Sequence, residues 1–213
     1  MHTSDNFFSP RFYWPLGIVG LLFLIILTLI LKANNGVFTF TADDAYVHFK
    51  QAANILKGHY GINQGEFSAP CSSILWPMFL APFTLLPGLP WIVLFLNLGI
   101  VIATVRLQFF IIRQTFGKHS SAPDRSKKLL AGLLMISLII LTNLMPLLFS
   151  GMEYVWQIFI VHLIMLGLIN ENQSNHLPAY LIPGLITAPL IRYESLAIVF
   201  PAMIYLCIRG RSE

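Results

Sequence analysis

The stretch LPWIVLFLNLGIVIATVRLQFFIIRQTFGKHSSAPDRSKK, from Leu89 to Lys128, decides the fold class of this chain. Its first part, Leu89–Ile112, is predominantly apolar over 24 residues, and about 20 such residues suffice for a helix to cross the hydrocarbon core of a membrane. Its second part, 113–128, holds five basic residues and one acidic residue. Because basic loops stay on the cytoplasmic side, the stretch predicts a membrane-spanning helix that ends in a cytoplasmic loop.

The composition of the whole chain indicates the same class. Hydrophobic residues make up 56% of the 213 residues and charged residues 10%, whereas soluble domains usually carry about 25% charged residues. The net charge of +4 therefore bears on orientation in a membrane. The sequence has no basic, aromatic-interleaved stretch of the kind that binds nucleic acid. We expect an all-α polytopic membrane protein that does not bind nucleic acid.

Six apolar segments are expected to span the membrane within a single membrane domain, residues 1–213. Their approximate bounds are 15–32, 89–112, 129–149, 151–170, 177–190 and 194–208. Arg11, beside Tyr13 and Trp14, places the N-terminus in the cytoplasm. The first span then leads outside, and an odd number of further spans must follow it to reach the basic loop in the cytoplasm. The segment 89–112 supplies one, so the short apolar segment at about 72–86 should not cross. We expect a re-entrant or interfacial helix there, on the outer side.

The first outer loop, 33–88, also contains an amphipathic helix at about 42–57. Thr41 is its expected N-cap, Asp44 stands at N3, and Gly58 is expected to end it. The apolar stripe expected to face the bilayer surface consists of Ala45, Phe49, Ala52 and Leu56. The same topology puts Cys71 outside and Cys207 inside, so we expect no disulfide between them.

Five of the nine acidic residues are expected on the outer side, near membrane boundaries: Asp43, Asp44, Glu66, Glu153 and Glu194. Each has a structural interpretation. Asp43 and Asp44 suit a first helical turn, and Glu194 suits a salt bridge with Arg192. Glu66 suits a turn, and Glu153 suits the start of a helix. The functional interpretation is that the outer ends of the spans bring these acids around one cavity, where one of two neighbouring carboxylates could act as a general base.

A metal site is one of two alternatives for the same region. Asp44 and His48 are four residues apart and so lie on one helix face, and Glu66 follows in the same loop. Carboxylate and imidazole groups suit several divalent ions, so these three residues could hold such an ion as a cofactor. The other interpretation is that His48 is a hydrogen-bonded residue at the membrane interface.

The order of five motifs resembles a known family. They read ADDAYVHF, NILKGHYG, GEFSAPCSSILWP, SGMEY and IRYES, and the resemblance extends over roughly Phe7 to Ile208. The chain resembles the N-terminal part of a GT-C superfamily glycosyltransferase, with similarity to the protein mannosyltransferase, lipid A aminoarabinose transferase and arabinofuranosyltransferase branches. Tyr193 stands where the family usually has proline.

The resemblance implies a GT-C-like transmembrane core that takes a sugar from a polyprenyl-phosphate donor on the extracytoplasmic face, with inversion. The acceptor would be a hydroxyl of a glycan, lipid or protein. Asp43 or Asp44 would be the general base, Glu66 would help to bind a metal or the donor phosphate, and Arg192 would meet that phosphate. The residues expected to contact substrate are Glu66, Arg192, Glu194, Glu153 and His48.

The same resemblance bears on location and completeness. It implies a multi-pass protein among the lipids of a bacterial inner membrane, with an extracytoplasmic active site. Because members generally have more spans, we expect either a partial core or a short form that pairs with a partner subunit.

Two other functions fit the sequence. A transporter or flippase for a lipid-linked saccharide would use polar residues within spans, for which Asn97, Arg106 and His162 are the candidates. A non-catalytic membrane subunit of a cell-envelope assembly would fit the short length of the chain.

Overall fold

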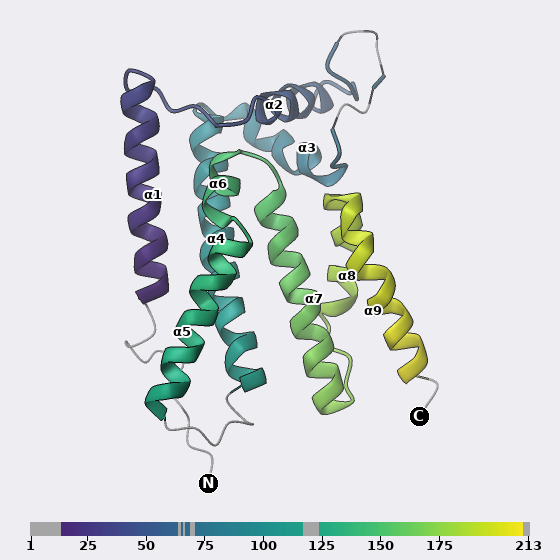
Figure 1. The fold of residues 1–213 in the computed structure, drawn as a ribbon. Helices are drawn as coiled ribbons and strands as arrows, with labels where there is room; N and C mark the ends of the chain where they lie inside the picture. Colours follow the sequence, from purple (N-terminus) through teal and green to yellow (C-terminus); the bar gives the residue numbers. More distant parts are fainter. Residues whose placement is uncertain (1–13, 64, 66, 69–70, 117–123, 211–213) are drawn as a thin grey trace.

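The computed structural model describes residues 14–63, 65, 67–68, 71–116 and 124–210, which form helices and connecting turns without a strand (Figure 1). The elements are α1 (Trp14–Ala33), α2 (Asp44–Ile55), α3 (Leu75–Leu80), the 3-10 helix η2 (Ala81–Leu85), α4 (Leu89–Phe116), α5 (Asp124–Leu141), α6 (Leu144–Phe149), α7 (Tyr154–Ser174), α8 (Leu181–Ile191), the 3-10 helix η3 (Tyr193–Ser195) and α9 (Leu196–Arg209). The all-helical prediction is therefore confirmed for this part of the chain.

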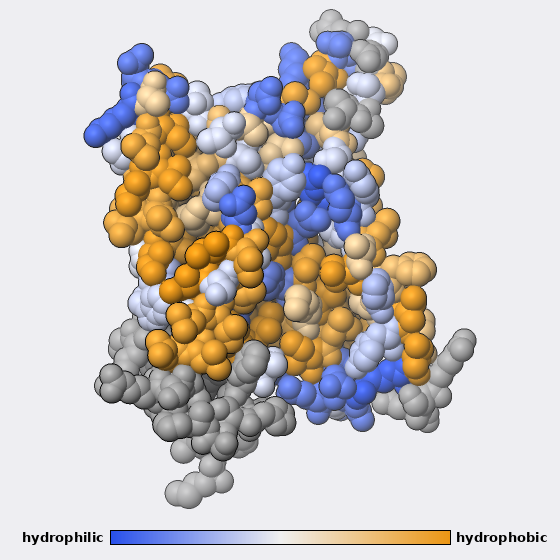
Figure 2. Space-filling view, viewed as in Figure 1, coloured by the Kyte–Doolittle hydropathy of each residue, from blue (hydrophilic) through white to orange (hydrophobic). Residues whose placement is uncertain are grey.

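Three helices are long and apolar enough to cross a membrane, judged by length and composition: α1, the Leu89–Ile112 part of α4, and α7. By contrast, α8 has 11 residues and α9 has 14. At 1.5 Å per residue they are about 17 and 21 Å long, shorter than a hydrocarbon core of about 30 Å. On the face seen in Figure 2, apolar residues cover much of the middle of the bundle, and hydrophilic residues gather toward the upper end and the described part of the lower end.

The helices bring distant segments to one end of the bundle. In Figure 1, α2 and α3 lie across the upper end, where the turn before α7 and the α8–η3 junction also lie. Helix α2 packs on α3, α3 packs on α8, and α7 packs on both α4 and α8. The C-terminal end of α4 and the N-terminal end of α5 lie toward the opposite end, and residues 117–123 between them are outside the described part.

The start of α2 differs from the prediction. Asp43, not Thr41, is the N-cap, and its Oδ1 accepts a hydrogen bond from the Asp44 N–H at 3.1 Å. Thr41 instead donates from its backbone N–H and its hydroxyl to the carbonyl of Phe149, at 2.9 and 3.0 Å. This carbonyl lies 108 residues away in sequence, so local capping rules could not indicate it. The end is as predicted, since Gly58 has φ +75° and directly follows the last turn.

The face that α2 buries also differs from the predicted stripe. Ala45 and Ala52 are buried as expected, but Leu56 is exposed and polar His48 is buried in its place. The reason is that α2 packs on protein at this face, on α3 and η2.

The segment predicted as one helix over 129–149 is divided between α5 and α6. Asn143 adopts a left-handed conformation with φ +52°, which asparagine tolerates better than most residues. Pro146 explains the break, because it lacks the N–H that would bond the Thr142 carbonyl four residues earlier and its ring would clash with that carbonyl. Leu147 then restarts the pattern by donating to Asn143 at 3.2 Å.

Candidate functional site

Glu153 lies at the centre of the buried polar groups at this end of the bundle. It is the N-cap residue of α7 and is 0% exposed. The turn that carries it is shaped by Gly151, whose φ is +75°. A Cβ at Gly151 would lie 2.6 Å from the Phe40 ring and 2.8 Å from Ala45, so the turn packs directly against the first loop and α2. The motifs ADDAYVHF and SGMEY are thus in contact.

Arg192, the C-cap of α8, contacts two carboxylates. Its Nη1 donates to Glu153 Oε1 at 3.0 Å, while Nε and Nη2 donate to the two oxygens of Glu194 at 3.1 and 2.6 Å. The guanidinium also lies 4.4 Å from the centroid of the Tyr154 ring. The predicted Arg192–Glu194 salt bridge is confirmed, and Glu153 is a second partner that was not predicted.

The pKa values of the ionisable groups in this cluster shift according to their burial and their partners. Burial raises the pKa of Glu153, and Arg192 acts in the opposite direction. The hydrogen bonds from Arg192 hold the pKa of the half-exposed Glu194 below its usual range. Burial lowers the pKa of His48 to about 4, with the charge of Asp44 opposing and that of Arg192 reinforcing the change. His48 is therefore neutral at pH 7, and its 3.6 Å approach to Glu153 is a polar contact rather than an ion pair.

The segment before α3 closes the cluster from a third direction. The Ser72 hydroxyl donates to Glu153 Oε1 at 3.4 Å, and the buried Ser73 hydroxyl accepts the Trp76 N–H at 3.0 Å. The backbone N–H of Ile74 donates to the carbonyl of Leu190 at 3.2 Å, which ties the start of α3 to the end of α8. The SSILWP motif therefore meets the IRYES motif through the backbone.

The two adjacent aspartates have different surroundings. Both are exposed, but the Asp43 carboxylate caps α2, whereas Asp44 lies near enough to act by its charge on His48 and Cys71. Burial, Glu153 and Asp44 together raise the pKa of Cys71 to about 11, so this residue is a thiol at neutral pH and a poor nucleophile. Both cysteines are free, with Cys207 exposed on α9.

The predicted metal set is incomplete in the described part of the chain. Glu66 lies outside the described residues, so its relation to Asp44 and His48 is not established. Among the residues described, no group of three or more His, Cys, Asp or Glu side chains could hold a metal ion.

Several buried polar atoms in α2, α3 and the turn before α7 have no hydrogen-bond partner among the described residues. They are His48 Nδ1, both amide atoms of Gln51, Trp76 Nε1 and Glu153 Oε2. An unsatisfied buried polar atom costs about 1–3 kcal/mol, which marks this cluster as functional or strained. Sequence reasoning missed Gln51, although it follows His48 by three residues and so lies on the same helix face.

The residues suggested for a transport path, Asn97, Arg106 and His162, lie on α4 and α7 and are not among the contacts of Glu153. Asn97 accepts the Trp156 indole N–H at 3.0 Å and donates to the Met152 carbonyl at 3.3 Å. His162 contacts Gln108 at 3.2 Å, which also joins α7 to α4. Such pairs are typical of polar contacts that hold apolar helices together. Arg106 is exposed on α4 and does not belong to these pairs.

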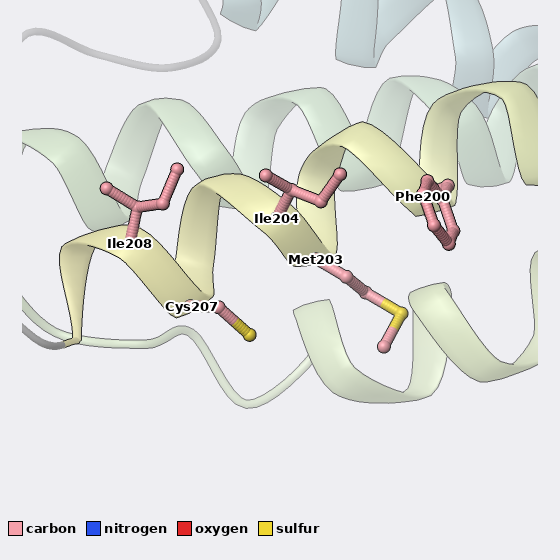
Figure 3. A pocket seen from close by; sticks show the side chains of 5 residues that line it. All are labelled: Phe200, Met203, Ile204, Cys207 and Ile208. Carbon is pink, nitrogen blue, oxygen red and sulfur yellow. The ribbon is translucent and has the colours of Figure 1, made fainter.

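An apolar hollow lies elsewhere, on α9. Five side chains line its volume of about 300 Å³, Phe200, Met203, Ile204, Cys207 and Ile208, and all come from one helix (Figure 3). It contains none of the residues grouped around Glu153.

Comparisons with protein-family models, curated proteins and solved structures gave no match to this chain.

Proposed function

We propose that this chain carries the transfer site of a GT-C-like membrane glycosyltransferase, which moves a sugar from a polyprenyl-phosphate donor to an acceptor hydroxyl. One observation carries the proposal. Four of the sequence motifs, separated by up to about 150 residues, meet around Glu153 and Arg192 at one end of the helices. Each brings a polar group that suits acid–base chemistry or phosphate binding.

The proposed base is Asp44. Asp43 already accepts a hydrogen bond as the cap of α2, whereas Asp44 is exposed beside the cluster. Its carboxylate would take the proton from the acceptor hydroxyl as the oxygen forms its bond to the anomeric carbon. The bond from that carbon to the phosphate oxygen breaks, and its electron pair leaves with the prenyl phosphate. Attack from the opposite side inverts the anomeric centre.

Arg192 is the proposed phosphate ligand. A guanidinium has five N–H donors, and three of them are used toward Glu153 and Glu194. The two that bond to no described residue can donate to phosphate oxygens and stabilise the charge that develops on the leaving group. Glu194, half exposed beside Arg192, and neutral His48 would help to shape the polar surroundings of the donor.

The proposal includes a location. A prenyl chain requires lipid beside the site, and the apolar sides of the bundle fit that requirement. We propose a multi-pass inner-membrane protein with up to six spans, a cytoplasmic N-terminus and the α2–α3 end on the extracytoplasmic side. Cysteines introduced at Gln64 and Ser120 should be labelled from outside and inside, respectively, and the opposite pattern would reverse the orientation.

The activity is tested in membranes that contain the full chain. Labelled prenyl-phosphate mannose, arabinofuranose and aminoarabinose are supplied as donors, and transfer to membrane acceptors is measured. Asp44→Asn should lower transfer on the order of 100-fold, because general bases contribute about 10²–10⁴-fold. Lys50→Gln is the matched control, since it removes an exposed charge from the same helix and should leave transfer unchanged.

Three outcomes would contradict the proposal or part of it. Wild-type membranes that transfer none of the three sugars above the background of membranes without the chain would overturn the glycosyltransferase assignment for these donors. Undiminished transfer by Asp44→Asn would remove Asp44 as the base. A loss confined to Asp43→Asn would assign the base to the neighbouring aspartate.

A further inference from the structure

The sequence suggested that Glu153 contacts substrate, but its position in the structure indicates a different role. Its side chain is 0% exposed and lies beneath Arg192, whose side chain is 11% exposed. Ser72 and His48 approach the same carboxylate from two other segments. A group enclosed on these sides reaches a substrate only through its neighbour.

We infer that Glu153 is a positioning residue, which fixes the guanidinium of Arg192 so that its remaining N–H donors face a phosphate group. This inference rests on the proposed function for the identity of the ligand. The contact between Glu153 and Arg192 is independent of the proposed function, because it is a hydrogen bond of 3.0 Å between two buried groups.

The geometry explains why Glu153, more than Glu194, would determine where Arg192 lies. Glu194 contacts the guanidinium through two atoms, but its side chain is 42% exposed and belongs to a 3-10 turn of three residues. Solvent-exposed ion pairs contribute about 0–1 kcal/mol, whereas removal of one partner from a buried pair is far more disruptive. Glu153 is also anchored by the backbone, because it is the N-cap residue of α7 and follows the packed Gly151 turn.

The contact of Arg192 with the Tyr154 ring adds a second constraint on the guanidinium, and it also comes from the start of α7. Tyr154 is the next residue after Glu153 and lies 4.4 Å below the guanidinium. The hydrogen bond holds one edge of the guanidinium, and the ring contacts the guanidinium from a second side. One turn of chain, at the start of α7, therefore supplies both constraints on a side chain that belongs to the α8–η3 junction.

The first test measures the accessibility of Arg192 without any substrate. The full chain in detergent is treated with phenylglyoxal, which modifies arginine side chains, and the modified peptides are quantified by mass spectrometry. Arg192 should react slowly in the wild type and several-fold faster in Glu153→Gln. Arg209 is at the far end of α9 and serves as the internal reference, with an unchanged rate in both proteins.

Glu171→Gln is the matched control for general loosening. Glu171 is also a buried glutamate that pairs with an arginine, Arg209, at 2.7 Å, but it lies near the other end of α7. It should leave the rate at Arg192 unchanged, with Arg106 of α4 as the reference for this variant because the substitution removes a partner of Arg209. An equal rate at Arg192 in wild type and Glu153→Gln, or an equal acceleration by Glu171→Gln, would overturn the inference.

The second test uses transfer from whichever prenyl-phosphate sugar the wild type accepts. Misplacement of a positioned group by about 1 Å can cost on the order of 100-fold, so Glu153→Gln should lower kcat/KM for the donor by a similar factor. Arg192→Lys should have a comparable effect, and the double variant should be no worse than either single variant. Multiplicative losses would overturn the inference, because they would show that the two residues act independently.

The two tests separate the inference from the proposed function. A wild type that transfers no sugar contradicts the function, and the phenylglyoxal rates then still decide whether Glu153 fixes Arg192. A wild type that transfers sugar but whose Arg192 reacts at the same rate with or without Glu153 retains the function and overturns the inference.

Discussion

Gly151→Ala should be the most disruptive single-methyl change at the candidate site. The residue has φ +75°, a backbone conformation that residues other than glycine rarely adopt. The added Cβ would also lie 2.6 and 2.7 Å from two atoms of the Phe40 ring and 2.8 Å from the Cβ of Ala45. Both neighbours are buried, so neither can move away without displacing α2 from the start of α7.

The two effects can be given magnitudes. A left-handed conformation costs an alanine about 1–2 kcal/mol, and overpacking a well-packed core costs about 1–3 kcal/mol. Their sum predicts a loss of about 2–5 kcal/mol in the free energy of unfolding. Because Glu153 lies two residues further along, the same displacement should disturb its contacts with His48 and Arg192.

Two other glycines separate these effects. Gly36 has φ +85° with nothing within 4 Å of an added Cβ, so Gly36→Ala isolates the backbone cost. Gly20 lies in α1 and is also open, so Gly20→Ala should be neutral or stabilising by up to about 1 kcal/mol. From the most to the least stable variant, the expected order is Gly20→Ala, Gly36→Ala and Gly151→Ala.

The assay is thermal unfolding of the detergent-solubilised chain, followed by tryptophan fluorescence. Phe40→Leu should cost less in the Gly151→Ala background than in the wild type, because it makes room for the new methyl group. Equal losses for Gly151→Ala and Gly36→Ala would refute the reasoning, since they would mean that the turn before α7 does not pack against Phe40.

Further predictions concern buried polar groups and the α5–α6 break. The pKa of His48 falls from 6.5 to about 4 on folding, so the unfolded chain binds more protons between these values. Its burial therefore costs about 3 kcal/mol of stability as pH falls through that window, and His48→Gln should remove this dependence in Tm measured against pH; parallel Tm curves would contradict it. Gln51→Met should stabilise the chain by about 1–2 kcal/mol, because both amide atoms of Gln51 are buried without a partner in the described part of the chain; a lower Tm would show that the amide is satisfied. Asn143→Gly should be tolerated and Asn143→Val should cost at least about 1 kcal/mol, because a left-handed conformation excludes β-branched residues; equal denaturation midpoints would remove this reason for the break.

The sequence indicated the helices well because apolar segments and their interruptions are local features. The long helices α1, α4 and α7 follow from unbroken apolar runs, and the end of α2 follows from Gly58. The break before α6 could also have been predicted, because Pro146 cannot donate to the Thr142 carbonyl four residues earlier. The segment was nevertheless predicted as one helix, because its composition is apolar throughout. Composition indicates an apolar environment, whereas continuity of a helix depends on each backbone N–H.

Several charged members of the candidate site were predictable from the sequence, but Gln51 and the arrangement of the site were not. Arg192 and Glu194 are two residues apart, so their pairing follows from the sequence. Glu153 comes from another segment, 39 residues before Arg192, and its burial depends on α2, the segment before α3 and the α8–η3 junction together. A local sequence pattern does not predict the burial of an acidic side chain when three distant segments cover it.

That depth is what separates the roles of the acids at this end of the bundle. Asp44 and Glu153 are both carboxylates within electrostatic reach of His48 or in contact with it, yet Asp44 is exposed and Glu153 is enclosed. An exposed carboxylate can approach and take a proton from an incoming hydroxyl, whereas an enclosed one acts only on the groups that enclose it. Asp44→Asn should therefore lower sugar transfer on the order of 100-fold while leaving the reactivity of Arg192 unchanged, and Glu153→Gln should change that reactivity. If both substitutions altered Arg192 alike, burial would not distinguish the two acids, and the division of roles argued from it would fail.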